Sequence, residues 1–239
     1  MTPKVCVAIC NYNHTRFLKE SIQSIVNQKY SNLDIVVVDD GSKDQDVVRE
    51  IINLISDNRI RFIPISKNSG KWNALNTAFA STDAVICTSH DADDISLGWR
   101  IGAQLEALVS TKTAHNLCGF ISCWSEEEVI QGKEILEPKT LRFGHGPEIQ
   151  QLVIKGFETP GINHYFTGNF ETAGVSAMFY KRIWDLGYRF NPPNCGIRVL
   201  HSEDSDFNFR VTANLGLTSI LAETPYLYRR NTSTNFEEK

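Results

Sequence analysis

The chain has 239 residues, of which 41% are hydrophobic and 22% charged, and its formal net charge is −4. This length suits one large α/β domain or two small ones, and the composition is ordinary for a globular protein. The negative charge argues against a general binder of nucleic acid or anionic membranes. No apolar run approaches the roughly 18–20 residues that span a bilayer, and residues 1–13 lack the apolar core of a signal peptide.

The six cysteines form no C-x-x-C pair, and four of them lie in apolar, strand-like runs. This pattern favours buried free thiols in a reducing compartment over a disulfide framework. We therefore expect a cytoplasmic protein, and peripheral attachment to the inner face of a membrane stays open.

Strands and helices alternate through the first half of the chain. Apolar runs predict strands at 4–10, 33–38, 60–65 and 84–89, and apolar residues at helical spacing predict helices at 14–28, 44–55 and 70–81. Such alternation requires crossover connections, so the sheet should be mainly parallel. The nearly continuous apolar strands agree, because a parallel sheet is covered by helices on both faces.

The second half is less regular. We expect a helix near 97–109, a strand near 117–123, and an irregular insertion over 124–170 with a helix near 147–155. A strand at 172–180, a helix at 202–216 and two short strands at 217–222 and 225–230 follow. With no internal repeat and no low-complexity linker, residues 1–239 are predicted to form one domain.

Polar residues follow three of the predicted strands. Asn11–Asn13 follow the first strand, Asp39 and Asp40 the second, and Asp91 and Asp93 the fourth. In an open α/β sheet, ligands bind outside the carboxyl ends of the strands. These side chains should therefore converge on one edge of the sheet.

The run "HDADD", residues 90–94, brings three carboxylates into a small space after an apolar strand. Desolvating three like charges is costly unless a positive charge neutralises them. A hard divalent cation, Mg²⁺ or Mn²⁺, that carries a diphosphate fits best. Some of these acids also suit purely structural roles. The run "DDGS" at 39–42 suits a turn, and Asp94 is expected to cap the following helix.

The segments "VCVAICNYNHTRFLKESIQSIVNQKYSNLDIVVVDDGSKD", "NSGKWNALNTAFA" and "HDADD", in this order and spacing, resemble the family-2 glycosyltransferases. The similarity is close over residues 3–110 and resumes at "GVSAMFYKRIWDLGYRF" and "SEDSDFNFR". It implies a GT-A fold, in which a mainly parallel sheet is flanked by helices, with a small antiparallel part near the C-terminus. Residues 1–110 would bind a nucleotide sugar, and residues 111–239 would face the acceptor.

The resemblance also implies roles for single residues. Asp93 would ligate Mn²⁺ or Mg²⁺, Asp91 would face the ribose or the water shell of the metal, and Tyr12 would stack on the nucleobase. Asp204 would be the general base and Glu203 its neighbour, although acids also suit a helix N-terminus for electrostatic reasons. The residues expected to bind the nucleotide sugar are Cys10, Tyr12, Asp40, Lys71 and Asp91.

The implied reaction is inverting transfer from a nucleotide-diphosphate sugar, of the UDP type, to an acceptor hydroxyl. The acceptor would be a glycan, a lipid-linked sugar or a protein, and a nucleic-acid acceptor is a further alternative. The sequence does not indicate which sugar is transferred or what the oligomeric state is. Some relatives carry a histidine metal ligand where this chain has Asn231. Arg229 and Arg230 could neutralise the leaving diphosphate or lie in solvent.

Three alternatives to transfer stay open. A sugar-phosphate nucleotidyltransferase should have a glycine-rich loop after the first strand, where "CNYNHT" has no glycine. An aspartyl phosphatase should have D-x-D where Asn11 and Asn13 stand. A non-catalytic nucleotide- or glycan-binding module differs from an enzyme only in lacking turnover.

Overall fold

The computed structural model describes residues 2–123, 125–135, 154–155, 176–193, 202–215 and 217–230. Within them one sheet holds nine strands in the order β3-β2-β1-β4-β8-β6-β9-β5, and β7 pairs with β9. The strands are β1 (Val5–Asn11), β2 (Leu33–Asp40), β3 (Ile60–Ile65), β4 (Ile86–Asp91), β5 (Ile95–Ser96), β6 (His115–Cys123), β7 (Ile154–Lys155), β8 (Met178–Tyr180) and β9 (Leu217–Arg229).

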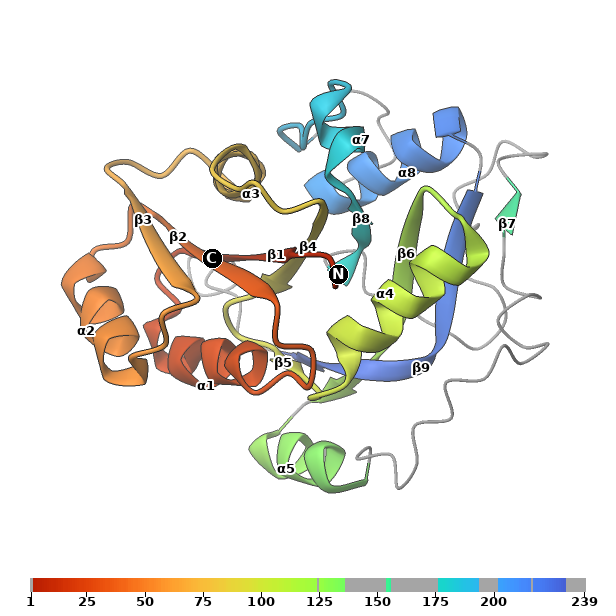
Figure 1. Cartoon of the computed structure of the whole chain (residues 1–239). Helices are drawn as coiled ribbons and strands as arrows, with labels where there is room; N and C mark the ends of the chain where they lie inside the picture. Colours follow the sequence, from red (N-terminus) through yellow and green to blue (C-terminus); the bar gives the residue numbers. More distant parts are fainter. Residues whose placement is uncertain are drawn as a thin grey trace.

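Helices cover both faces of this sheet, with α3, α7 and α8 on one side and α1, α2 and α4 on the other (Figure 1). Their bounds are α1 (Thr15–Val26), α2 (Gln45–Ile55), α3 (Lys71–Ala80), α4 (Arg100–Thr111), α5 (Glu126–Ile135), α7 (Lys181–Asp185) and α8 (Glu203–Leu215). The expected α/β architecture of helices around a mainly parallel sheet is confirmed.

Strands β1 to β4 form the parallel part of the sheet. β1 lies between β2 and β4, β2 pairs with β3, and all three pairings are parallel. Side chains of β1 alternate between two apolar layers: Val5 and Val7 lie in the layer of α1, α2 and α4, and Cys6 and Ala8 in that of α3 and α8. Because both faces are buried, the strand is apolar at consecutive positions, as its sequence predicted.

Antiparallel pairings begin at β8, which joins the two halves of the sheet. β8 runs antiparallel to both β4 and β6, while β6 and β9 are parallel. β5 and β7 add further antiparallel pairs to β9. The antiparallel part near the C-terminus is confirmed, and a single sheet runs through both halves of the chain.

The C-terminal segment forms one strand, β9, where the sequence predicted two. Its register with β6 shifts between Cys118 and Phe120, which pair with Leu221 and Tyr226. Residues 223–224, which separated the two predicted strands, therefore lie within one continuous strand at the point where its register with β6 shifts.

The segment predicted to be irregular contains helix α5, which was not predicted. Of the helix predicted near 147–155, residues 147–153 lie outside the described residues, and residues 154–155 form β7 instead. The strand predicted at 172–180 is confirmed only at Met178–Tyr180, and residues 172–175 also lie outside the description. The two-residue strand β5 is too short for periodicity to reveal.

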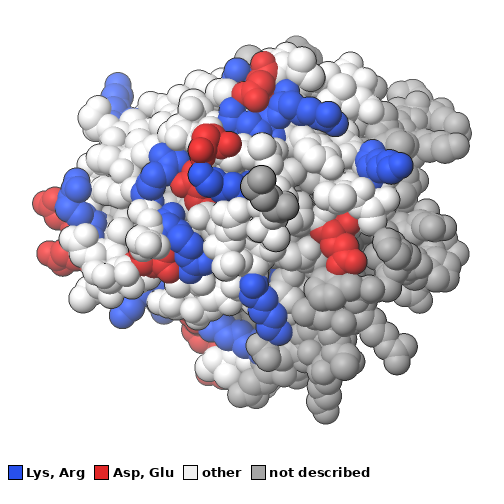
Figure 2. Space-filling view, in the orientation of Figure 1, with Lys and Arg blue, Asp and Glu red and all other residues white. Residues whose placement is uncertain are grey.

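The five cysteines of the described part are free, and all but Cys10 are buried, as expected. No helix in the described residues is both long and apolar enough to cross a membrane. On the face shown in Figure 2, basic and acidic side chains lie interspersed rather than in one large patch of a single sign. The described residues of that face therefore create no extended field of the kind that attracts polyanions.

His115, on the buried strand β6, is expected to make the fold sensitive to acid. Burial lowers the pKa of His115 to about 3, below the roughly 6.5 of an unfolded chain. Between pH 3 and pH 6.5, His115 binds a proton in the unfolded chain but not in the folded protein. Neutral His115 therefore contributes its full share to the free energy of unfolding above pH 6.5, and this share falls as the pH drops. From pH 7.5 to 5, His115 should lower the free energy of unfolding by about 2 kcal/mol.

Urea denaturation of wild type and His115→Gln at both pH values tests this. The variant can be less stable overall, so the measured quantity is the loss between pH 7.5 and 5, which should be about 2 kcal/mol smaller in the variant. Equal losses in the two proteins would show that His115 does not bind the proton on unfolding.

Candidate active site

The polar side chains that follow β1, β2 and β4 meet at one edge of the sheet, as predicted. Asn11 lies opposite Asp39 in the pairing of β1 with β2, and Cys10 lies opposite Asp91 in the pairing of β1 with β4. Parallel strands place their carboxyl ends together, which explains why segments 28 to 80 residues apart converge here.

Asp39 holds the loops after β1 and β2 together. It is fully buried, and its two oxygens accept from Asn11 Nδ2 (2.7 Å), the Ser42 backbone N–H (2.9 Å), Ser42 Oγ (2.7 Å) and Gln45 Nε2 (2.8 Å). With its lone pairs engaged in this way, Asp39 shapes the turn at 39–42.

Asp40 ties the loop before α3 to the end of β2. Its Oδ1 accepts from the Ser69 N–H at 3.0 Å, and its Oδ2 accepts from the Gly70 N–H at 2.7 Å. Gly70 is directly followed by Lys71, the first residue of α3. Asp40 therefore fixes the point from which Lys71 enters the site.

Gly41 allows the close approach of these two loops. Its φ of +81° is in the left-handed region, and a Cβ there would lie 2.5 Å from the Asn68 backbone nitrogen. Gly41→Ala should thus cost about 1–3 kcal/mol in backbone strain and displace the 67–70 loop that positions Lys71. We expect reduced stability by urea denaturation together with weaker donor binding.

Gly102→Ala is the matched control, because a Cβ at this position in α4 meets nothing within 4 Å. Alanine within a helix is favoured over glycine by about 0.5–1 kcal/mol, so this variant should be neutral or more stable. If Gly41→Ala behaved like Gly102→Ala, the close approach of the loops would be unimportant.

Lys71 connects two parts of the site that are far apart in the sequence. Its Nζ lies 2.5 Å from Asp91 Oδ1 and 3.5 Å from Glu203 Oε1. Burial alone would lower the pKa of Lys71, but the charges of Asp91, Glu203 and Asp204 together raise it well above its ordinary value. Lys71 is therefore a permanent cation between the end of β4 and the start of α8.

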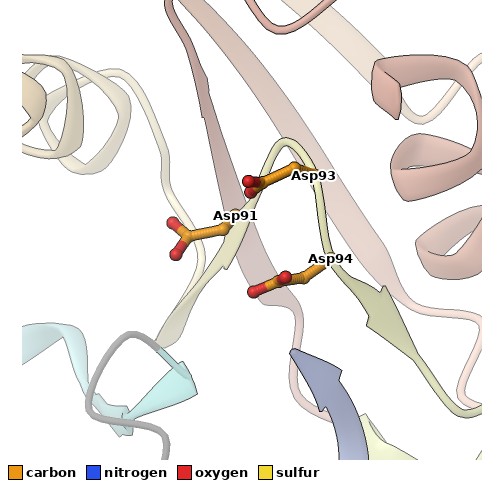
Figure 3. A group of neighbouring side chains, drawn as sticks. All are labelled: Asp91, Asp93 and Asp94. Carbon is orange, nitrogen blue, oxygen red and sulfur yellow. The ribbon is translucent and has the colours of Figure 1, made fainter. Parts of the chain in front are cut away.

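The three acids at the end of β4 and in the turn after it point to the same side of that turn (Figure 3). Oxygens of Asp91, Asp93 and Asp94 lie within 4.8 Å of one another. Burial, with the charge of Asp93, raises the pKa of Asp91 to about 6, although Lys71 acts in the opposite direction. The buried Asp94 Oδ2 has no hydrogen-bond partner among the described residues. Clustered carboxylates of this kind fit a hard divalent cation.

Asp94 does not cap the following helix, contrary to the prediction. Helix α4 begins only at Arg100, and its N-cap residue, Trp99, makes no side-chain cap hydrogen bond. Asp94 is instead fully buried and accepts from the Arg229 N–H at 2.8 Å. The short strand β5 between them separates the acidic turn from the helix.

Arg229 is committed to structural contacts. Its guanidinium donates to the Asp93 carbonyl at 2.6 Å and to Glu126 Oε1 at 3.1 Å, and it also pairs with Glu20. The side chain is only 2% exposed. Arg229 thus holds the acidic turn, α1 and α5 together, and the idea that it neutralises a leaving diphosphate is not supported by this geometry.

The buried guanidinium of Arg100 holds together the two segments that flank the acidic turn. Arg100 is fully buried and donates to Thr88 Oγ1 and the Ser89 carbonyl at 2.9 Å each, and to Ser96 Oγ at 2.8 Å. These acceptors flank residues 90–95 on both sides. The buried His90 contacts Ser96 Oγ with one ring nitrogen and the Asp94 carbonyl with the other, each at 3.2 Å, and is structural.

Helix α8 begins with the acids of the "SEDSDF" motif, and the three acids differ in their contacts. Glu203 faces Lys71, as described above. Asp206 accepts from Arg210 Nη2 at 2.6 Å and from Asn191 Nδ2 at 3.0 Å. Asp204 accepts only from the N–H of its neighbour Ser205, at 2.7 Å, among the hydrogen bonds of the described residues. Among the described residues, Asp204 therefore accepts no hydrogen bond from another side chain, whereas Asp206 accepts from two.

The remaining predicted residues line the same edge. Tyr12 is 38% exposed, as a ring available for stacking must be. Cys10 lies close enough to the charges of Lys71, Asp91, Glu203 and Asp40 for all four to affect its thiol, whose pKa is raised chiefly by burial.

His14 was not among the residues predicted for the site, yet its Nδ1 lies 3.9 Å from Asp93 Oδ2. Its position just beyond the polar residues that follow β1 was the signal that could have revealed it. The sheet edge therefore offers a nitrogen donor beside the carboxylates.

The order of this sheet, with helices on both of its faces, fits the GT-A fold. The sequence model of glycosyl transferase family 2 matches residues 6–181, and the chain belongs to this family.

Two curated relatives are longer than this chain. An uncharacterized glycosyltransferase of Haemophilus influenzae is 41% identical over 96 residues, which cover 39% of this chain and 29% of that protein. The bifunctional glycosyltransferase pgtA of Dictyostelium discoideum is 26% identical over 247 residues, 95% of this chain and 31% of its own length. The chain thus spans about a third of each of these relatives.

Two solved structures show the same fold. S. aureus TarS (residues 1–349) in complex with UDP-GlcNAc superposes with a TM-score of 0.71 at 14% identity, covering 99% of this chain and 61% of that one. The mannosyltransferase PcManGT from Pyrobaculum calidifontis, in complex with GDP-Man and Mn²⁺, gives a TM-score of 0.60 at 19% identity, covering 99% and 59%.

Proposed function

We propose that this glycosyltransferase moves a sugar from a uridine-diphosphate sugar to an acceptor hydroxyl with inversion at the anomeric carbon. The observation that carries the proposal is the position of Lys71 between Asp91 and Glu203. Lys71 brings the cluster of Asp91, which suits a metal-bound diphosphate, next to the motif of Glu203, which suits a general base. The two motifs are more than 100 residues apart in the sequence.

In this proposal Asp204 removes the proton of the acceptor hydroxyl. The oxygen attacks the anomeric carbon from the face opposite the diphosphate, the bond to the diphosphate breaks, and the nucleotide leaves. A single displacement needs one base and no protein nucleophile. Asp204, with few structural partners, is free for this task, whereas Asp206 is bound to Arg210.

Lys71 is proposed to contact the donor diphosphate, because it is a permanent cation at the edge where the nucleotide would bind. Asp93 would be the principal ligand of Mn²⁺ or Mg²⁺, with Asp91 facing its water shell or the ribose. A divalent cation bound there supplies positive charge that stabilises the leaving diphosphate. Tyr12 would stack on the base, and Cys10 would lie against the nucleotide.

The uridine preference is proposed to depend on Asp40. Each of its oxygens accepts one backbone N–H and retains a lone pair for a second donor such as the uracil N–H. Cytosine has no hydrogen on N3, and losing such a partner costs about 1–3 kcal/mol, so uridine diphosphate should bind more tightly than cytidine diphosphate by a corresponding factor. Calorimetric titration of the two nucleotides with Mn²⁺ checks this. Equal affinities would remove Asp40 from base recognition.

The decisive experiment is a screen of nucleotide sugars with and without Mn²⁺. Thermal shift reports binding, because a specific ligand raises stability with its concentration. Chromatography of the nucleotide product then reports the reaction. Release of uridine diphosphate upon addition of glycan, lipid-linked sugar or protein acceptors supports transfer. Binding without any turnover would favour a binding module, and release of pyrophosphate from sugar phosphate and nucleotide triphosphate would favour a nucleotidyltransferase.

A further inference from the structure

His14 stands opposite the metal ligand proposed above. It lies between β1 and α1, whereas Asp93 lies in the turn after β4, so two separate loops bring these side chains together. His14 Nδ1 and Asp93 Oδ2 are 3.9 Å apart, and each side chain is 19% exposed. Both groups are thus partly sheltered and still reachable by an ion from solvent.

The distance between these two atoms has a chemical meaning. It is too long for a hydrogen bond, which needs about 2.7–3.2 Å between nitrogen and oxygen. Two ligand atoms that each lie about 2.1 Å from one divalent cation are separated by about 3.0–4.2 Å, depending on the angle at the ion. The observed 3.9 Å falls within this interval.

The imidazole of His14 has no competing structural task among the described residues. His14 occupies the N-cap position of α1, yet it makes no side-chain cap hydrogen bond. The next residue, Thr15, anchors this end of the helix by donating from its hydroxyl to Asp44 Oδ2 at 2.7 Å. The His14 ring is therefore available to a ligand.

We infer that His14 is a protein ligand of the catalytic cation, binding through Nδ1 beside Asp93 Oδ2. This inference rests on the metal-assisted transfer proposed above and adds a determinant of metal choice. Mg²⁺ is coordinated almost wholly by oxygen, whereas imidazole nitrogen favours transition metals. His14 should accordingly make the site select Mn²⁺ or Co²⁺ over Mg²⁺.

The rival explanation is an ion pair between a protonated His14 and Asp93, and it predicts the opposite sign. Removing a positive charge beside a metal ligand should strengthen cation binding, because less repulsion opposes the incoming ion. Removing a ligand should weaken binding. The effect of His14→Ala on metal affinity therefore distinguishes the two.

The test measures Mn²⁺ and Mg²⁺ affinity in the presence of uridine diphosphate, by electron paramagnetic resonance for Mn²⁺ and by competition for Mg²⁺. His14→Ala should weaken Mn²⁺ binding at least about tenfold, the lower end of what even an outer-shell partner of a metal site contributes. Mg²⁺ affinity should change much less. Lys19→Ala, an exposed change in the helix that follows His14, is the control and should leave both affinities unchanged.

Pulsed electron paramagnetic resonance of the wild-type protein provides a readout that needs no variant. Directly coordinated imidazole gives a ¹⁴N coupling to Mn²⁺, and that coupling should disappear in His14→Ala. Absence of the coupling in wild type, or unchanged or tighter Mn²⁺ binding in His14→Ala, would overturn the inference. If wild type binds no Mn²⁺ at all, the metal in the proposed function fails as well. If Asp93→Asn alone loses Mn²⁺, only the role of His14 fails.

Discussion

Asp204→Asn is expected to lower turnover by about 10²- to 10⁴-fold, the usual contribution of a positioned general base. Donor affinity should stay near the wild-type value, because a base acts in the transition state far more than in the bound ground state. Asp204 lies at the start of α8, next to Glu203, which contacts Lys71 in the proposed donor site. The measurement is donor affinity by calorimetry and turnover with a confirmed acceptor.

Two neighbouring acids serve as controls for Asp204. Asp206→Asn breaks the pair with Arg210, so it should lower stability with little effect on turnover of the folded enzyme. Glu203→Gln should act through Lys71 and therefore mainly on donor affinity. Near-normal turnover of Asp204→Asn, combined with loss of turnover in either control, would assign the base elsewhere.

Asp93→Asn is expected to abolish metal-dependent donor binding while the protein stays folded. The change removes one negative charge from a side chain that is 19% exposed and keeps its size, so the fold should tolerate it. Calorimetric titration of uridine diphosphate in the presence and absence of Mn²⁺ measures the effect, and circular dichroism verifies the fold. In the variant, the two titrations should coincide.

Asp83→Asn is the matched control for this variant, because it alters the net charge equally at a surface site. The Asp83 side chain is 81% exposed and pairs with Lys4, outside the candidate site. Its metal-dependent donor binding should be that of wild type. Unchanged metal-dependent affinity in Asp93→Asn would remove Asp93 from the set of metal ligands.

The sequence alone determined the parallel half of the fold and the edge of the sheet where the candidate site lies. Apolar periodicity is a local property, and the handedness of strand–helix–strand connections leaves few arrangements for β1 to β4. Once these strands are parallel, the residues at their carboxyl ends must meet at one edge. The convergence of Asn11, Asp39 and Asp91 was predictable for that reason.

Only the tertiary structure decided what each polar side chain does at that edge. Arg229 pairs with Glu20, 209 residues away in the sequence, and with Glu126, 103 residues away. Asp94 receives the Arg229 N–H rather than capping a helix, and Lys71 joins Asp91 to Glu203. These contacts depend on which distant elements pack against one another. A local sequence pattern does not specify that packing. The same reason explains why His14 became visible as a candidate ligand only beside Asp93.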